Sequence, residues 1–144
     1  MPIQSLNPTT ELVEKTFSAL TASEIQEKIA TAGLAFASWK NASFAVRVGL
    51  MANLSQLLKD NAEKLARSMA VEMVKPITAG EAEIRKCATV VDFYATNAEN
   101  YLKNEAVATD ATESFVSFEP LGVILAVMPW KFPFWQVIRF AAPA

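Results

Sequence analysis

A continuous apolar run, Gly122 to Met128, constrains the fold of this chain more than any other feature of its sequence. Its residues do not alternate between apolar and polar, and this pattern is typical of a parallel strand that is covered on both faces. Such a strand needs neighbouring strands, yet the sequence contains no second run of this kind. Because parallel strands are joined by long crossover connections, we expect the rest of the sheet to come from more protein or from another subunit.

Four amphipathic helices are predicted before this run. Thr21-Ala22-Ser23-Glu24 is a capping box, Ser43 can cap a second helix, Asp60 to Glu63 opens a third, and a fourth starts at Thr78, just after Pro76. Each helix is expected to bury one apolar stripe. The stripes are Ile25, Ile29, Ala32, Phe36 and Trp39; Val46, Leu50, Leu54 and Leu57; Leu65, Met69 and Met73; and Ile84, Cys87, Val91, Tyr94 and Ala98.

Short β-structure is expected on either side of these helices. Residues 3 to 18 indicate a hairpin with a turn at Asn7 to Thr10, and Ser114 to Phe118 indicates an edge strand or bridge. The segment Trp135 to Ala144 resembles a helix that would cover the apolar run. The predicted fold class is therefore α/β.

Composition excludes several classes of function. The 13 basic and 15 acidic side chains give a net charge of -2 without a basic cluster, which argues against a nucleic-acid partner. One cysteine and no histidine exclude a disulfide framework, a Cys/His metal site and a histidine relay, and no metal is expected. Prolines and charges within residues 120–144 argue against a membrane span, and the N-terminus lacks a signal-peptide pattern, so a cytoplasmic location is expected.

The densest group of unusual residues is Met128 to Trp135, at the predicted carboxyl end of the apolar strand. Ligands bind to such loops in open α/β sheets. Two prolines near Trp130 and Lys131 predict a rigid loop that could hold one polar group beside apolar side chains. On composition alone, a buried turn from which Lys131 reaches solvent is the commoner outcome.

The segments Glu119 to Trp130, Phe132-Pro133 and Phe134 to Ala144 closely resemble the aldehyde dehydrogenase superfamily, and within it bacterial succinate-semialdehyde dehydrogenases. The resemblance covers essentially the whole chain but only about the first third of a family member. It extends upstream through Asn7-Pro8, Phe36 to Trp39, Glu72-Met73, Lys75-Pro76 and Gly80 to Cys87.

This resemblance implies that residues 1–144 form the N-terminal part of a domain that binds NAD or NADP. The matching residues Val127, Met128, Pro129 and Trp130 would line the nicotinamide end of the site. In the family, hydride passes from a thiohemiacetal on a cysteine to the nicotinamide, a glutamate activates the deacylating water, and an aldehyde becomes a carboxylic acid. Those two residues match positions beyond Ala144, so residues 1–144 alone are expected to be inactive. Residues 105–120 would belong to the β-structure through which subunits form a homo-oligomer.

Two positions depart from the family pattern. Lys131 stands where the family has an asparagine whose amide holds the oxyanion, and a long charged side chain there predicts a poor catalyst. Val74 stands where the family usually has glycine, so it would be strained if the third helix ends with a positive φ. Cys87 is interpreted as core packing, and Lys75 and Arg139 as solvated or structural charges.

Two rival interpretations remain open. One is a non-catalytic remnant or subunit-association module, which would use residues 122–128 and 105–120 to join another subunit. The other is a free-standing helical domain in which residues 122–144 form a buried helix; the β-branched residues and prolines of that segment count against it.

Overall fold

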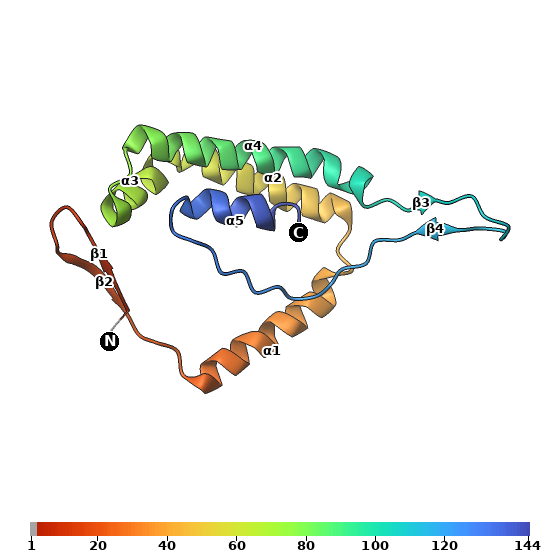
Figure 1. Ribbon diagram of the computed structural model, residues 1–144, viewed down its shortest axis with the longest axis horizontal. Coiled ribbons are helices and arrows are strands. Elements are labelled where there is room, and N and C mark those ends of the chain that lie inside the picture. The colour runs from red at the N-terminus through yellow and green to blue at the C-terminus, as the bar shows by residue number, and fades with distance from the viewer. Residues whose placement is uncertain (1–2) are drawn as a thin grey trace.

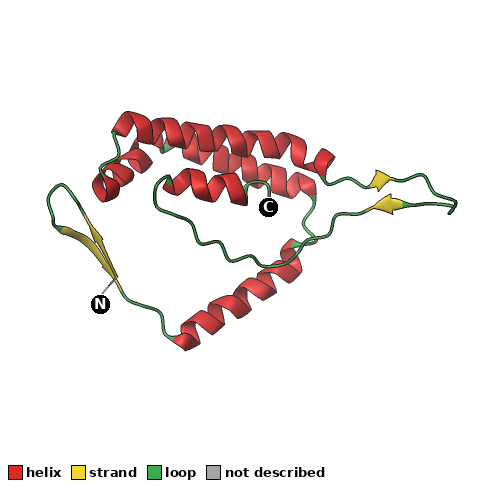
Figure 2. Cartoon of the chain, viewed as in Figure 1, coloured by secondary structure: helices red, strands yellow, loops and turns green. Residues whose placement is uncertain are grey.

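A computed structural model describes residues 3–144 of the chain and contains five helices and two small sheets (Figure 2). The order is β1 (Ile3–Leu6), β2 (Val13–Phe17), α1 (Ala22–Trp39), α2 (Phe44–Asp60), α3 (Ala62–Met73), α4 (Ile77–Tyr101), β3 (Glu105–Ala106), β4 (Phe115–Val116) and α5 (Pro133–Ala141). The predicted mixture of helices and strands is confirmed. The rival prediction that residues 122–144 form a buried helix is wrong, because only Pro133–Ala141 of this segment is helical.

Helix α4 is the centre of the structure, and α2, α3 and α5 pack against it (Figure 1). The buried apolar residues come from these four helices: Leu58, Ala62, Ala66, Met69, Ile84, Cys87, Ala88, Val91 and Ile138. Gly80 lets α4 approach α3 closely, since a Cβ atom there would lie only 2.8 Å from the Cβ of Ala66. The core is therefore a helical layer built around α4.

The capping signals at Thr21 and Ser43 are confirmed, whereas α3 and α4 begin without a side-chain cap. The backbone N–H of Glu24 donates to the Thr21 hydroxyl over 3.3 Å, and the Thr21 N–H donates to the Glu24 carboxylate over 2.7 Å. The Ser43 hydroxyl accepts from the Val46 N–H at the start of α2. These caps need only residues within one helical turn, which is why the sequence predicts them well.

Both β-segments are antiparallel hairpins. β1 pairs with β2, and the Asn7 side chain accepts from the Thr9 N–H over 3.0 Å within the turn, as predicted for residues 3–18. β4 lies within the predicted strand Ser114 to Phe118 and pairs with β3, so that Glu105 faces Val116. This second hairpin projects away from the helices (Figure 1).

The predicted buried strand at residues 122–128 is wrong for this structure. The segment is not assigned as a strand, and it is largely exposed, with Leu125 at 90% and Val127 at 87%. Among the described residues, the backbone of 117–131 forms no hydrogen bond with another backbone group. A strand exists only when a neighbour completes its ladder, and no described segment lies in that place.

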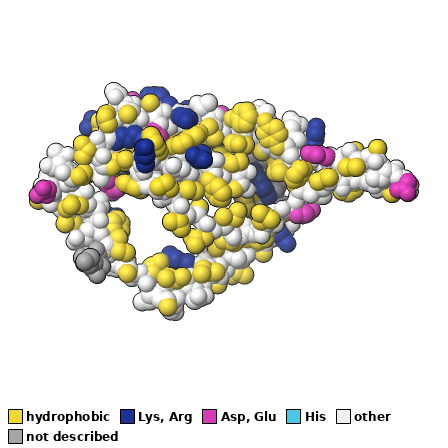
Figure 3. Space-filling model, viewed as in Figure 1, with side chains coloured by type: hydrophobic (Ala, Val, Ile, Leu, Met, Phe, Trp, Pro, Cys, Tyr) yellow, Lys and Arg dark blue, Asp and Glu magenta, His cyan; other side chains and the backbone are white. Residues whose placement is uncertain are grey.

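The prediction that each helix buries its apolar stripe is wrong for α1 and for most of α2. No residue of α1 is buried, because this helix lies apart from the other four (Figure 1). In α2, Val46, Leu50 and Leu57 are exposed, and Ser55 and Leu58 face inward instead. Apolar side chains consequently cover much of the visible surface (Figure 3).

Candidate functional site

The motif loop, defined here as residues 128–132, leads directly into α5. Pro133 occupies the first turn of this helix, where its missing N–H costs nothing. No side chain of the motif loop caps α5. The Phe134 and Trp135 N–H groups instead donate to one oxygen of Glu83, over 3.1 and 2.9 Å, so the helix is capped by a residue of α4 that lies about fifty positions earlier.

Glu83 is buried, and its second carboxylate oxygen forms an ion pair with Lys75. The two side chains are only 4% and 10% exposed. Lys75 belongs to the turn between α3 and α4, and its ammonium lies 4.4 Å from the centre of the Phe132 ring. The structural role expected for Lys75 is thus confirmed, and its partner is a buried carboxylate.

The two other lysines near the motif loop are exposed. Lys86 lies on the face of Trp135, with its ammonium 3.8 Å from the ring centre. Lys131 points its ammonium to within 5.8 Å of the Phe132 ring centre and remains exposed to solvent. The α5 end of the motif loop is therefore surrounded by three lysines, of which only Lys75 has a buried carboxylate as partner.

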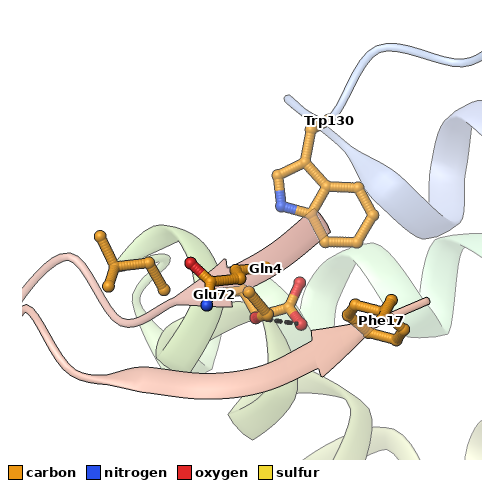
Figure 4. A pocket seen from close by; sticks show the side chains of 6 residues that line it. Gln4, Phe17, Glu72 and Trp130 are labelled. Carbon is orange, nitrogen blue, oxygen red and sulfur yellow. Dashed lines mark hydrogen bonds between the residues drawn. The ribbon is translucent and has the colours of Figure 1, made fainter. Parts of the chain in front are cut away.

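The four residues predicted to line the nicotinamide end of the site, Val127 to Trp130, do not line one common pocket. Trp130 lines a cavity of about 390 Å³ together with Gln4, Ser5, Leu6, Phe17 and Glu72 (Figure 4). The Ser5 hydroxyl donates to the Glu72 carboxylate there over 2.8 Å. Val127 and Pro129 are exposed, Met128 is half-buried, and none of the three lines this cavity.

The turn that holds Lys75 begins with a strained residue. Val74 ends α3 with φ 56° and ψ 30°, in the left-handed region. A β-branched side chain is disfavoured there, and the region normally favours glycine. Strain at Val74 was expected if the third helix ended there with a positive φ, and the structure has this conformation.

Cys87 has the role predicted for it. Its side chain is fully buried in the helical core. Burial, followed by the negative charge of Glu83, raises the pKa of the thiol to about 11. The thiol stays protonated near neutral pH, so this residue supplies no nucleophile.

Glu83 is a site residue that was not predicted, although its spacing in the sequence is a signal for it. Gly80, Glu83, Cys87 and Val91 recur at helical spacing on one face of α4, and all four are buried. A glutamate inside an apolar stripe needs a partner, because an unpaired buried charge is costly. Its partners lie 8, 51 and 52 residues away, which helical spacing cannot reveal.

Among residues 3–144, no cluster of three or more His, Cys, Asp or Glu side chains is arranged to hold a metal ion. None of the helices described there combines the length and apolar character that crossing a membrane requires.

Comparison with known proteins gives a consistent result. The sequence model of the aldehyde dehydrogenase family matches residues 1–144. A probable succinate-semialdehyde dehydrogenase (NADP(+)) from Synechocystis is 46% identical over the whole chain, which covers 32% of that protein. Succinate-semialdehyde dehydrogenase (NADP(+)) 1 from Mycobacterium tuberculosis is 44% identical, also over the whole chain and 32% of its own length. The chain thus spans about a third of the length of these relatives.

Solved structures agree with the sequence comparison. Succinic semialdehyde dehydrogenase from Streptococcus pyogenes, in complex with NADP+, superposes with a TM-score of 0.92 at 30% identity, over 97% of this chain and 31% of that one. A glyceraldehyde-3-phosphate dehydrogenase from Methanocaldococcus jannaschii, complexed with NADP, gives 0.91 at 26% identity, over 98% and 31%. The five helices and two hairpins therefore adopt the arrangement found in part of these enzymes.

Proposed function

The chain belongs to the aldehyde dehydrogenase family, and from that membership we propose that it supplies the cofactor side of an enzyme that oxidises succinate semialdehyde, or a similar aldehyde, to the acid. The observation that carries the proposal is the 46% identity to a succinate-semialdehyde dehydrogenase over every residue of the chain. The names of the relatives favour NADP over NAD as the electron acceptor. A cytoplasmic location is part of the same proposal.

The residues proposed to contact the cofactor suit its nicotinamide end better than its phosphates. Val127 to Trp130 present apolar and aromatic surface, and their backbone groups have no backbone partner among the described residues. Such groups can contact a planar ring and donate to or accept from a carboxamide. The cavity beside Trp130 contains the Glu72 carboxylate and no basic side chain, which disfavours a phosphate there.

When bound, the cofactor would accept a hydride from the substrate carbon. The contribution proposed for this chain is positional: Trp130 presents an aromatic face, and Lys131 presents a donor where the family has an asparagine amide. An ammonium on a flexible stem is a less fixed donor than an amide, and it brings a full charge. The only cysteine of the 144 residues is buried, so the attacking thiolate has to come from elsewhere, and residues 1–144 alone are proposed to be inactive.

The β3–β4 hairpin is the segment proposed for subunit association. It lies within residues 105–120 and projects from the helices with both outer strand edges unpaired (Figure 1). Unpaired edges bind further strands readily. We propose that this hairpin pairs with a second copy of the protein in a homo-oligomer.

A second candidate is a non-catalytic association module. The observation that favours it is the exposed apolar segment at residues 121–127, together with the departures at Val74 and Lys131. In this alternative, another chain covers the segment, and no dehydrogenase activity is associated with the complex.

A chimeric enzyme tests the proposed function. Residues 1–144 replace the matching third of the Synechocystis enzyme, and NADPH formation from succinate semialdehyde is measured. We expect slow turnover with Lys131 and roughly a hundred- to thousandfold faster turnover with Lys131→Asn, the range found when one oxyanion donor is lost or restored. The intact Synechocystis enzyme is the control. A folded Lys131→Asn chimera without activity would contradict the proposal and favour the association module.

A further inference from the structure

We propose that Glu83 is the positioning residue of the motif loop: its buried carboxylate fixes residues 128–132, and with them Trp130 and Lys131, against α4. The relevance of this role to catalysis rests on the proposed function. The contacts that establish it do not, because they are formed within residues 75–135 themselves.

The amide groups at the start of α5 bind Glu83. Pro133 has no N–H to donate, so the first free amides of the helix belong to Phe134 and Trp135. Both donate to the same oxygen of Glu83. A carboxylate at a helix N-terminus is favoured by the helix dipole and forms charge-assisted hydrogen bonds. Glu83 thus performs the capping task that no side chain of the motif loop performs.

The Glu83 carboxylate is almost fully buried, and Lys75 neutralises it from the α3–α4 turn. Lys75 also lies over the ring of Phe132, the last residue of the motif loop. Breaking a buried pair by removing one partner is strongly destabilising, since an uncompensated charge remains. The pair therefore connects the α5 end of the motif loop to α4 and to the α3–α4 turn.

The backbone of the motif loop is held from its α5 side and not from its amino-terminal side. Residues 117–131 form no backbone hydrogen bond with another backbone group in the described chain, so the amino-terminal side of the motif loop is held by none. The hydrogen bonds that hold the loop backbone are then those on its α5 side. There, Glu83, Lys75 and Lys86 contact Phe132, Phe134 and Trp135. Of these three residues, only Glu83 accepts hydrogen bonds from the loop–helix backbone.

Amide hydrogen exchange of the 144-residue chain, followed by NMR, tests the proposal. In Glu83→Ala we expect exchange of the Phe134 and Trp135 amides to accelerate by about ten- to a hundredfold, which matches the loss of a charge-assisted hydrogen bond. The Trp130 indole signal should shift, and the Phe134 and Trp135 amides should lose more protection than amides within α2 and α3. Glu81→Ala is the matched control, because Glu81 lies on the same helix and pairs with Arg85 at the surface.

Glu83→Gln keeps the test decisive if Glu83→Ala does not fold. The amide oxygen can still accept from Phe134 and Trp135, but the charge that pairs with Lys75 is gone, so we expect a smaller acceleration, at least threefold, and the same shift of the Trp130 signal. Unchanged exchange and an unchanged Trp130 signal in Glu83→Gln would overturn the proposal. So would equal effects in Glu81→Ala. Because no cofactor or turnover enters this measurement, its failure is distinct from an inactive chimera.

Discussion

Val74 shows how a single residue can conflict with the backbone that surrounds it. Its left-handed conformation costs a non-glycine residue about 1–2 kcal/mol, and β-branching adds to the conflict. The strain was predicted from the family resemblance, which places a glycine where this chain has Val74, on the condition that the third helix ends with a positive φ. The role of Glu83, in contrast, could not be predicted. Its residue type and spacing were visible, but its partners come from the α3–α4 turn and from α5.

Replacing Val74 with glycine should stabilise the chain. We expect Val74→Gly to raise the free energy of unfolding by about 1 kcal/mol, the relieved strain less the greater backbone entropy of glycine. Val71→Gly is the matched control, because Val71 lies within α3, three residues earlier, where glycine should destabilise by about 0.5–1 kcal/mol. Urea unfolding measures both. A loss of stability in both variants would show that residue 74 is not strained.

Cys87 should make stability fall in alkaline solution. Its folded pKa of about 11 lies above its ordinary value of 9.0, so the folded state holds its proton when the unfolded state has released it. The resulting stabilisation is fully present below pH 9 and is lost as pH rises toward 11. Urea midpoints at pH 8 and pH 10 test this, with Cys87→Ala as the comparison. An equally steep decline in that variant would assign the effect to other groups.

At the scale of elements, local signals predicted where the helices occur but not which faces they bury. The caps at Thr21 and Ser43 are formed as expected, yet α1 buries nothing and α2 turns Ser55 and Leu58 inward. The Ser55 hydroxyl reaches the Ala88 carbonyl of α4 over 3.3 Å. Burial depends on which helix lies opposite, and this depends on the tertiary arrangement rather than on spacing within one helix.

The contact between α3 and α4 depends on the small size of Gly80. We expect Gly80→Ala to destabilise the chain by about 1–3 kcal/mol, because the new methyl group would overlap Ala66. Gly49→Ala in α2 provides the matched control: nothing lies within 4 Å of its added Cβ, so the better helix propensity of alanine should stabilise by about 0.5–1 kcal/mol. Thermal or urea unfolding compares the two. Equal stabilisation by both substitutions would contradict the close packing of α3 and α4.

For the whole molecule, the sequence identified the family and the α/β class, and the structure and comparisons confirm both. The buried strand at residues 122–128 could not form here, because a parallel sheet depends on residues far apart in sequence. Apolar side chains of this segment and of α1 are exposed (Figure 3), because no described segment packs against them. The candidate site described here consists of the motif loop and Glu83, and the only cysteine of the sequence is buried in the helical core.

A crystal structure of the Lys131→Asn chimera with NADP would show whether the segment Val127 to Trp130 faces the nicotinamide, as proposed. We expect the nicotinamide ring within about 4 Å of this segment, the distance of van der Waals contact. The Phe134 and Trp135 amides should still donate to Glu83. A nicotinamide ring bound elsewhere, with no atom of residues 127–130 in contact, would contradict the claim.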